Sequence, residues 1–240
     1  MSANAPQERT ELIHAIYGVE KAVEPFVLVT DKQELFHYLK SKGMVPEIWG
    51  TRDWPGTRSF DELWEEYQDE DSVLAVMRNG DVARFIRTIT LYIYRDKWYP
   101  GHAKPTREIL REFVLLPGRP ERERHYANSA SEKMKWFESD PLDAIRRLLT
   151  DELGLRVIEQ HLREPLLLEV PDSVSYMKDG KEALKIDIHQ SHAYPGIVTH
   201  NRLCHYMYKL VKRYWEDVYR EVQDRKILEF RWKSTNAPDT

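Results

Sequence analysis

The stretch PLDAIRRLLTDELGL, residues 141–155, decides the fold. Proline suits the first position of a helix, and glycine suits the position just beyond its last turn. Pro141 and Gly154 occupy those two positions, so the sequence predicts one helix over residues 141–153. Its N-cap is Ser139 or Asp140, and its apolar stripe consists of Leu142, Ile145, Leu149 and Leu153.

Segments with the pattern of β-strands lie on both sides of this helix. Before it, two such segments flank Asn79-Gly80, a dipeptide typical of tight hairpin turns. After it, residues 212–224 have the pattern of an amphipathic helix instead. We therefore expect strands at 73–77, 82–94, 110–116, 155–159, 165–170, 184–188, 202–210 and 227–232.

Residues 1–70 are expected to form a mostly helical N-terminal extension, and residues 71–240 a separate domain. The pairs Asp31/Glu34 and Ser59/Glu62 have the spacing of capping boxes, and they predict helices over 32–41 and from 59 to about 68. Helices flanking a long mixed sheet indicate an α+β fold, packed as an α/β/α sandwich. Residues 119–138 fit neither pattern and predict a long exposed loop.

Composition excludes several classes of protein. Hydrophobic residues make up 41% of the 240 residues and charged residues 32%, which is typical of a folded globular chain. The formal net charge of −4 gives no strong signal for nucleic-acid binding. The single cysteine, Cys204, excludes an internal disulfide and favours a cytoplasmic location. No apolar run reaches the ~20 residues of a membrane span, so we expect no membrane partner.

Three segments together resemble the Nudix superfamily. Residues 141–155 are similar to the second half of the Nudix box, with Arg147, Asp151, Glu152 and Gly154 in register. LREFVLLPGR (110–119) resembles the strand and Pro-Gly turn before the box, and SHAYPGIVTHNRL (191–203) resembles a segment that follows it. The resemblance covers about residues 73–233 and implies a Nudix-like sheet flanked by helices.

The box is degenerate at the positions that bind metal in active relatives. Leu148 stands where the family has a metal-binding glutamate, and Lys133 replaces the opening glycine. The resemblance implies that position 148 faces a metal cleft, so Leu148→Glu would restore a third acid beside Asp151 and Glu152. Those two acids would hold Mg²⁺ weakly, because this cation prefers several carboxylate oxygens.

The resemblance and the local chemistry nominate a set of candidate site residues. Asp151 and Glu152 are the metal candidates, and Mg²⁺ is the only cofactor suggested. Glu152, Glu138, His189 and His192 are the candidates for acid, base or other catalytic work. The candidate ligand-binding residues, which combine cations for phosphate with aromatic rings, are Arg87, Tyr92, Arg119, Trp136 and Tyr194.

These features favour a Nudix-fold protein that binds, senses or scaffolds a small phosphorylated ligand without hydrolysing it. One alternative is an atypical Mg²⁺-dependent hydrolase of a nucleoside or isoprenoid diphosphate. Another is a non-hydrolytic, isomerase-like enzyme in which the histidines around 189–192 carry acid/base work. A homo-oligomer is compatible with each of these functions.

Overall fold

The structure is a computed structural model that describes residues 5–17, 26–117, 120–123, 130–154, 167–169, 175–178, 181–184, 186–210, 212, 215–223 and 226–234. The chain divides into two compact units. Both contain helices and antiparallel strands, which confirms the α+β class. Unit 1 comprises Met1–Thr88, Lys133–Ser139 and Ser175–Leu203, and unit 2 comprises Ile89–Glu132, Asp140–Val174 and Cys204–Thr240.

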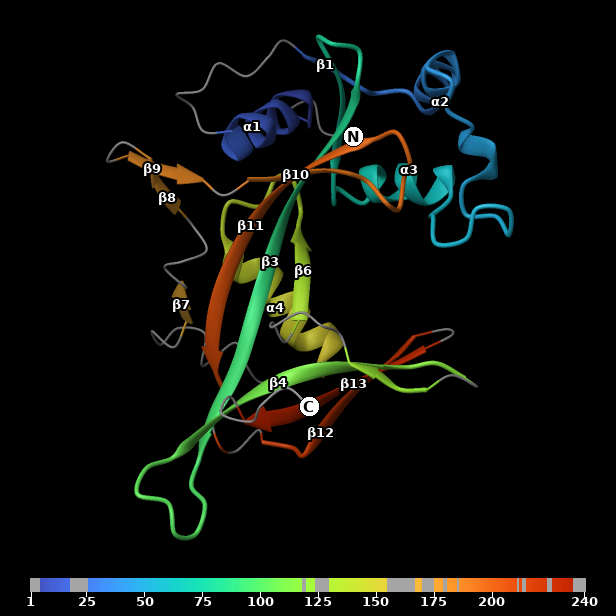
Figure 1. Cartoon of the computed structure of the whole chain (residues 1–240). Coiled ribbons are helices and arrows are strands. Elements are labelled where there is room, and N and C mark those ends of the chain that lie inside the picture. Colours follow the sequence, from blue (N-terminus) through green and yellow to red (C-terminus); the bar gives the residue numbers. More distant parts are fainter. Residues whose placement is uncertain are drawn as a thin grey trace. The chain divides into compact units, whose positions relative to one another are not determined.

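The two helices predicted within unit 1 begin where the sequence places them. The Asp31 carboxylate accepts a hydrogen bond from the Glu34 backbone N–H at 2.8 Å. Ser59 and Glu62 exchange both hydrogen bonds of a capping box, at 3.1 and 2.7 Å. The described helices of this unit are α1 (Ala5–Tyr17), α2 (Lys32–Ser41), α3 (Phe60–Gln68) and the short 3-10 helix η1 (Pro46–Ile48) (Figure 1).

The strands of unit 1 include the predicted hairpin. Gly80 has a φ of +84°, which a glycine adopts without strain, and its N–H donates to the Met77 carbonyl to close the turn. β1 pairs with β2 and β2 with β3, while β10 pairs with β11, all antiparallel. The strands are β1 (Phe26–Leu28), β2 (Val73–Met77), β8 (Ser175–Lys178), β9 (Lys181–Leu184) and β10 (Ile186–Gln190), with the first parts of β3 (Val82–Lys97) and β11 (Val198–Lys209).

Two hydrophobic clusters form the core of unit 1. One packs α1 on β2 and β3 and includes Trp136; its buried members are Leu12, Ile13, Val73, Ala75, Ala83, Phe85 and Trp136. The other joins α2 and α3 to β2 and to the turn after β10. Its buried members are Val29, Leu35, Leu39, Trp49, Phe60, Leu63, Tyr67, Leu74, Val82, Tyr194 and Ile197.

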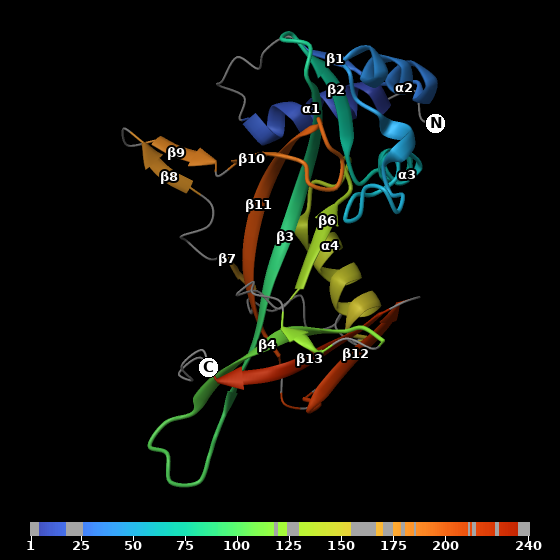
Figure 2. The same ribbon diagram turned by 45° about the vertical axis from the view of Figure 1, so that its right-hand side comes forward.

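Unit 2 is built on the antiparallel strand order β3-β4-β13-β12, and Figure 2 shows β4, β13 and β12 side by side. One face of this sheet is buried, since Leu110, Phe230 and Tyr219 are at most 3% exposed. The predicted strands at 110–116 and 227–232 are confirmed as parts of β4 and β13. The strands of this unit include β4 (Thr106–Leu115), β5 (Arg122–Glu123), β7 (Leu167–Glu169), β12 (Val218–Gln223) and β13 (Lys226–Ser234).

The predicted helix at 141–153 is present but changes its winding. It begins at Pro141, and the Asp140 carboxylate caps it by accepting from the Leu142 N–H at 2.9 Å. The α-helix α4 (Pro141–Arg147) continues into a π-helical turn, η2 (Leu148–Glu152), before Gly154 at φ +65°. No helix within the described ranges is long and apolar enough to cross a membrane.

Two sequence predictions are wrong. Residues 212–224 are not a helix, because β12 occupies Val218–Gln223 and pairs with β13 along its whole length. Pairing with a neighbouring strand outweighs the helical spacing of the side chains here. The stretch 119–138 is not one exposed loop either, since it contains β5 and β6 (Ala130–Met134) and buries Trp136. The strand predicted at 155–159 lies outside the described residues.

Candidate functional site

The candidate residues fall into both units. Unit 1 contains Arg87, Trp136, Glu138, His189, His192 and Tyr194. Unit 2 contains Tyr92 on β3, and Asp151 and Glu152 in the turn η2. Arg119 and the side chain of Glu152 lie outside the described part of the structure. The two sets are therefore described separately.

Of the two metal candidates on the turn η2, only Asp151 has a described side chain. Leu148 is 1% exposed and Leu149 is fully buried, so both point into the core. The expectation that position 148 faces a metal cleft is therefore wrong. Asp151 is exposed. Among the residues that the structure describes, no three His, Cys, Asp or Glu side chains are grouped so that they could hold a metal ion.

Arg87 serves the fold of unit 1. One terminal nitrogen of its guanidinium donates to the backbone carbonyls of Lys135, Trp136 and Glu138. The Glu138 carboxylate in turn accepts from the Lys135 backbone N–H at 2.8 Å. Trp136 packs in the core beneath this bend. These contacts hold the segment after β6 against β3. The candidates Arg87, Trp136 and Glu138 therefore have a structural role in unit 1.

The histidines around the β10–β11 turn are mostly exposed. His189 and His192 both face solvent. His200, which the sequence suggests only as a possible third metal ligand beside these two, is 8% exposed and stacks on Phe85 with ring centroids 4.9 Å apart. Burial lowers the pKa of His200, and the nearby His189 lowers it further. The imidazole of His200 is therefore uncharged at neutral pH, and it packs on Phe85 as an aromatic ring.

Tyr194 lies beside a second candidate site, a group of charged side chains. Its ring is completely buried, and the guanidinium of Arg84 lies over it at 5.6 Å. The hydroxyl lies close to Arg58 without an aligned hydrogen bond. Burial raises the pKa of Tyr194, and the negative charge of Glu66 raises it further. Tyr194 is therefore a neutral phenol next to a cluster of charged side chains.

That group of charged side chains, the Glu66 cluster, consists of Glu66, Arg58, Arg84, Lys133, Asp71 and Lys135. Arg84 donates from Nε and Nη2 to one oxygen of Glu66, Oε2, at 2.9 and 2.6 Å. Arg58 Nη1 and Lys133 Nζ both lie 2.8 Å from the other oxygen, Oε1. Lys135 Nζ contacts Asp71 at 2.7 Å, and Lys133 Nζ lies 3.9 Å from Asp71.

The cluster is partly buried and carries more cations than anions. The side chains of Glu66 and Arg84 are each 9% exposed, whereas that of Arg58 is 52% exposed and that of Lys133 is 26%. Burial alone would raise the pKa of the Glu66 carboxyl, but Arg84 and Lys133 outweigh it and lower that pKa. Burial lowers the pKa of the Lys133 amine, and Arg84 adds to this effect. The arrangement can attract and orient an anion.

Sequence reasoning did not find this cluster. Its residues come from the loop before α3, from α3 itself, from the turn between α3 and β2, from β3, and from β6 and the residue after it, so segments far apart in the sequence must meet to form it. One signal was present, because Glu66 and Arg84 interrupt otherwise apolar positions of α3 and β3. A charged residue at a core position needs a charged partner.

The comparisons with known proteins add no relative. No protein family, no curated protein and no solved structure matches the chain.

Proposed function

We propose that this chain is a Nudix-type protein that binds an anionic, phosphate-bearing small molecule without hydrolysing it, through the Glu66 cluster of unit 1. The observation that carries the proposal is the charge balance of the cluster. Four cations, Arg58, Arg84, Lys133 and Lys135, surround two carboxylates, Glu66 and Asp71, and Glu62 adds a third negative charge near Arg58. The excess positive charge would be neutralised by a bound anion.

Geometry and exposure support phosphate in particular. A guanidinium presents its donors in a planar fork that matches phosphate oxygens, and an ammonium adds three more donors. Arg58 and Lys133 reach solvent, while Glu66 and Arg84 lie beneath them. Because Glu66 already holds Arg58, Arg84 and Lys133 in place, little side-chain freedom would be lost on binding.

The non-hydrolytic part of the proposal is supported by the helix α4 and its π-helical turn. Phosphoryl hydrolysis of the Nudix kind would require carboxylates facing one metal site. The apolar Leu148 is buried at the position of one of them, and Asp151 points to solvent. Among the described residues, Asp151 therefore gives little support for a hydrolase. The Glu66 cluster gives more support for a protein that binds phosphate.

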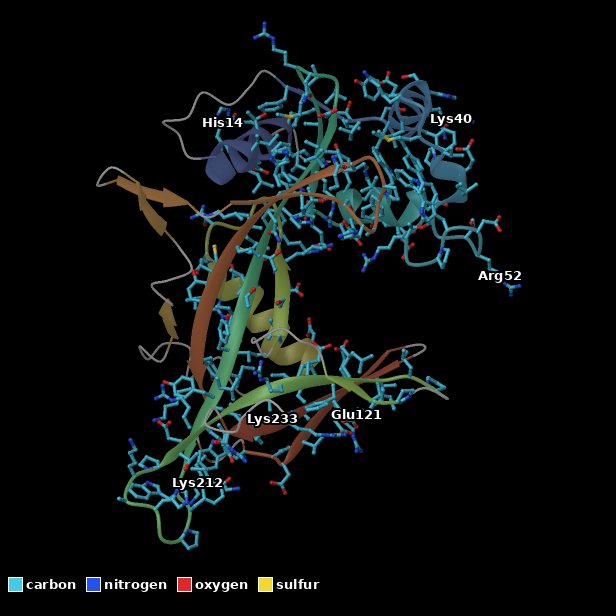
Figure 3. All side chains as sticks on the ribbon, in the orientation of Figure 1. His14, Lys40, Arg52, Glu121, Lys212 and Lys233 are labelled. Atoms are coloured by element: carbon cyan, nitrogen blue, oxygen red, sulfur yellow. The ribbon has the colours of Figure 1, made fainter. Side chains whose placement is uncertain are left out.

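Isothermal titration calorimetry with inorganic pyrophosphate, with and without Mg²⁺, tests the proposal. Wild type should bind without Mg²⁺, and Arg58→Ala should weaken binding about tenfold, as expected for one charge-assisted hydrogen bond. The matched control is Arg52→Ala, which removes an exposed arginine from the same unit (Figure 3).

Four results would overturn the proposal. One is the absence of pyrophosphate binding to wild type, and another is an equal loss in the Arg58 and Arg52 variants. The third is Mg²⁺-dependent turnover that Glu152→Gln abolishes, which would establish the hydrolase alternative. Metal-independent turnover lost in His189→Ala or His192→Ala would instead establish the isomerase-like alternative.

A further inference from the structure

The turn between β2 and β3 contains an asparagine that can lose its side-chain amide. Asn79 is followed by Gly80, and both residues are exposed. The backbone nitrogen of the next residue can attack the side-chain carbonyl carbon of an asparagine, and glycine, which has no Cβ, hinders this attack least. Asparagine is accordingly among the heat-labile residues of proteins. Asn79 and Gly80 therefore offer the reacting groups of a covalent modification.

The reaction needs water as its only co-reactant. The Gly80 nitrogen forms a bond to Cγ of Asn79, the bond from Cγ to Nδ2 breaks, and the Gly80 proton leaves with Nδ2 as ammonia. The product is a five-membered succinimide ring, which water then opens at one of its two carbonyl carbons. Attack on Cγ gives aspartate at position 79. Attack on the backbone carbon gives isoaspartate, in which the chain runs through Cβ and Cγ and is one carbon longer.

The folded turn holds the attacking nitrogen in a hydrogen bond. The Gly80 N–H donates to the Met77 carbonyl at 2.8 Å, and the Met77 N–H donates to the Asp81 carbonyl at 2.9 Å. The Gly80 nitrogen must lose its proton and align with Cγ of Asn79 before it can attack. The hydrogen bond to Met77 opposes both changes. The attack is therefore blocked while the turn stays closed.

The side chain of Asn79 is held as well. Its Oδ1 accepts from the Asp81 backbone N–H at 2.9 Å, and its Nδ2 donates to the Asp81 carboxylate at 2.7 Å. Both polar atoms of the amide thus have a partner on one neighbouring residue. The side chain has to give up these two hydrogen bonds before Cγ can turn toward the Gly80 nitrogen. Their loss makes the reactive geometry unfavourable in the folded turn.

Helix α2 packs on the same turn. The Tyr38 hydroxyl donates to the Gly80 carbonyl at 2.7 Å, in a partly buried contact. Lys42 also lies against Gly80, because a Cβ added to this glycine would come within 2.7 Å of the Lys42 Nζ. Opening of the turn therefore breaks contacts with a helix that is distant in sequence. Such an opening is a local unfolding event, and its free energy sets how often it occurs.

We infer that Asn79 is a site of spontaneous deamidation, which the closed hairpin protects and which local opening of unit 1 exposes. The strands β2 and β3 carry buried residues of both hydrophobic clusters, and the pair Ala75↔Ala83 joins them. Isoaspartate lengthens the backbone of the turn by one carbon, so the strands would no longer close in the same register. The modification would thus make an opening of the hairpin permanent. The inference does not depend on the proposed function, because no residue of the Glu66 cluster lies in the turn.

Peptide mapping by mass spectrometry tests this inference on the full-length chain, incubated at neutral pH with and without urea. The peptide that contains Asn79 should gain the mass of an amide-to-acid conversion, at least about tenfold more slowly in the folded chain than in urea. Enzymatic methylation identifies isoaspartate among the products. Asn79→Asp, which has no amide to lose, should show no mass gain in this peptide, and this assigns the conversion to position 79.

The variant Tyr38→Phe tests the protection that α2 provides. It removes the hydroxyl that is bonded to Gly80, and it should raise the conversion rate of the folded chain by about threefold to tenfold, as expected for one hydrogen bond. The rate in urea should stay the same, because the reacting groups of the unfolded chain are unaltered. The matched control, Tyr99→Phe, removes a hydroxyl that donates to Glu108 in unit 2 and should leave both rates unchanged.

A thermal melt identifies a Tyr38 variant that does not fold. Asp81→Ala then takes its place, because it frees the Asn79 amide on the exposed turn and should accelerate conversion of the folded chain in the same way. The inference is overturned if the folded chain converts as fast as the chain in urea, or if position 79 does not convert in urea. It is also overturned if Tyr38→Phe and Tyr99→Phe accelerate the conversion equally. None of these outcomes bears on the pyrophosphate test, so the two failures are distinguishable.

Discussion

Arg84 directs two donors, Nε and Nη2, to a single oxygen of Glu66 in the interior of unit 1. This geometry leaves the second carboxylate oxygen to Arg58 and Lys133. One buried carboxylate therefore fixes three cations that come from the loop before α3, from β3 and from β6. Removing the charge of this carboxylate should therefore lower the stability of unit 1.

Glu66→Gln should destabilise the protein by about 3–5 kcal/mol, because it leaves buried cations without their counter-charge. Urea unfolding at neutral pH, followed by circular dichroism, measures this cost. The control is Asp61→Asn on the same helix, where the carboxylate is 74% exposed and pairs with Lys32. That exposed pair should contribute nothing measurable. Equal effects of the two substitutions would contradict a structural role for the Glu66 cluster.

The same carboxylate should make stability depend on pH. The pKa of Glu66 in the folded protein is lowered from its ordinary 4.5, since Arg84 and Lys133 outweigh the effect of burial. A lowered folded-state pKa contributes stability that is present above the unfolded value and lost as the pH falls through the folded value. The difference in unfolding free energy between wild type and Glu66→Gln should therefore shrink below pH 4.5. A constant difference across that range would refute the linkage.

Local signals were enough to predict much of the fold. Caps act within four residues, so Asp31 and Ser59 identify the starts of α2 and α3 without knowledge of the rest of the chain. The turn at Asn79-Gly80 requires a positive φ, which glycine supplies. The strand Val218–Gln223 has no such local determinant, since its identity depends on pairing with β13.

The Glu66 cluster depends on contacts between distant residues, and this explains why it was not predicted. Arg84 follows Glu66 by 18 residues, and Lys133 comes from a later segment that the sequence assigns to a loop.

Ser59→Ala should cost about 0.5–2 kcal/mol, since the Ser59 hydroxyl accepts from the Glu62 N–H at 3.1 Å in a complete capping box. Thermal unfolding followed by circular dichroism checks the value. Ser41→Ala is a useful comparison, because the Ser41 hydroxyl only donates to the Tyr38 carbonyl within the last turn of α2. A larger loss at Ser41 than at Ser59 would contradict the capping role.

Leu149→Ala should cost about 2–5 kcal/mol, because the side chain is fully buried in unit 2 and its removal leaves a cavity. Denaturant unfolding of wild type and variant gives this value directly. Leu116→Ala provides the comparison, since Leu116 is 36% exposed and should cost much less. A cost near zero at Leu149 would show that this helix does not pack as described.

Leu148→Glu tests whether position 148 is buried in the core, as the structure has it, or faces a metal cleft, as the Nudix resemblance implies. At 1% exposure, Leu148 has no access to water, so a carboxylate there would be buried without a described partner. A buried charge of this kind costs several kcal/mol or forces the group to stay protonated. We therefore expect Leu148→Glu to lower the melting temperature sharply without creating Mg²⁺ binding in calorimetry. Leu148→Met, which conserves volume and polarity, should cost less than about 1.5 kcal/mol. A folded Leu148→Glu variant that gains tight Mg²⁺ binding would show instead that this position faces a metal site.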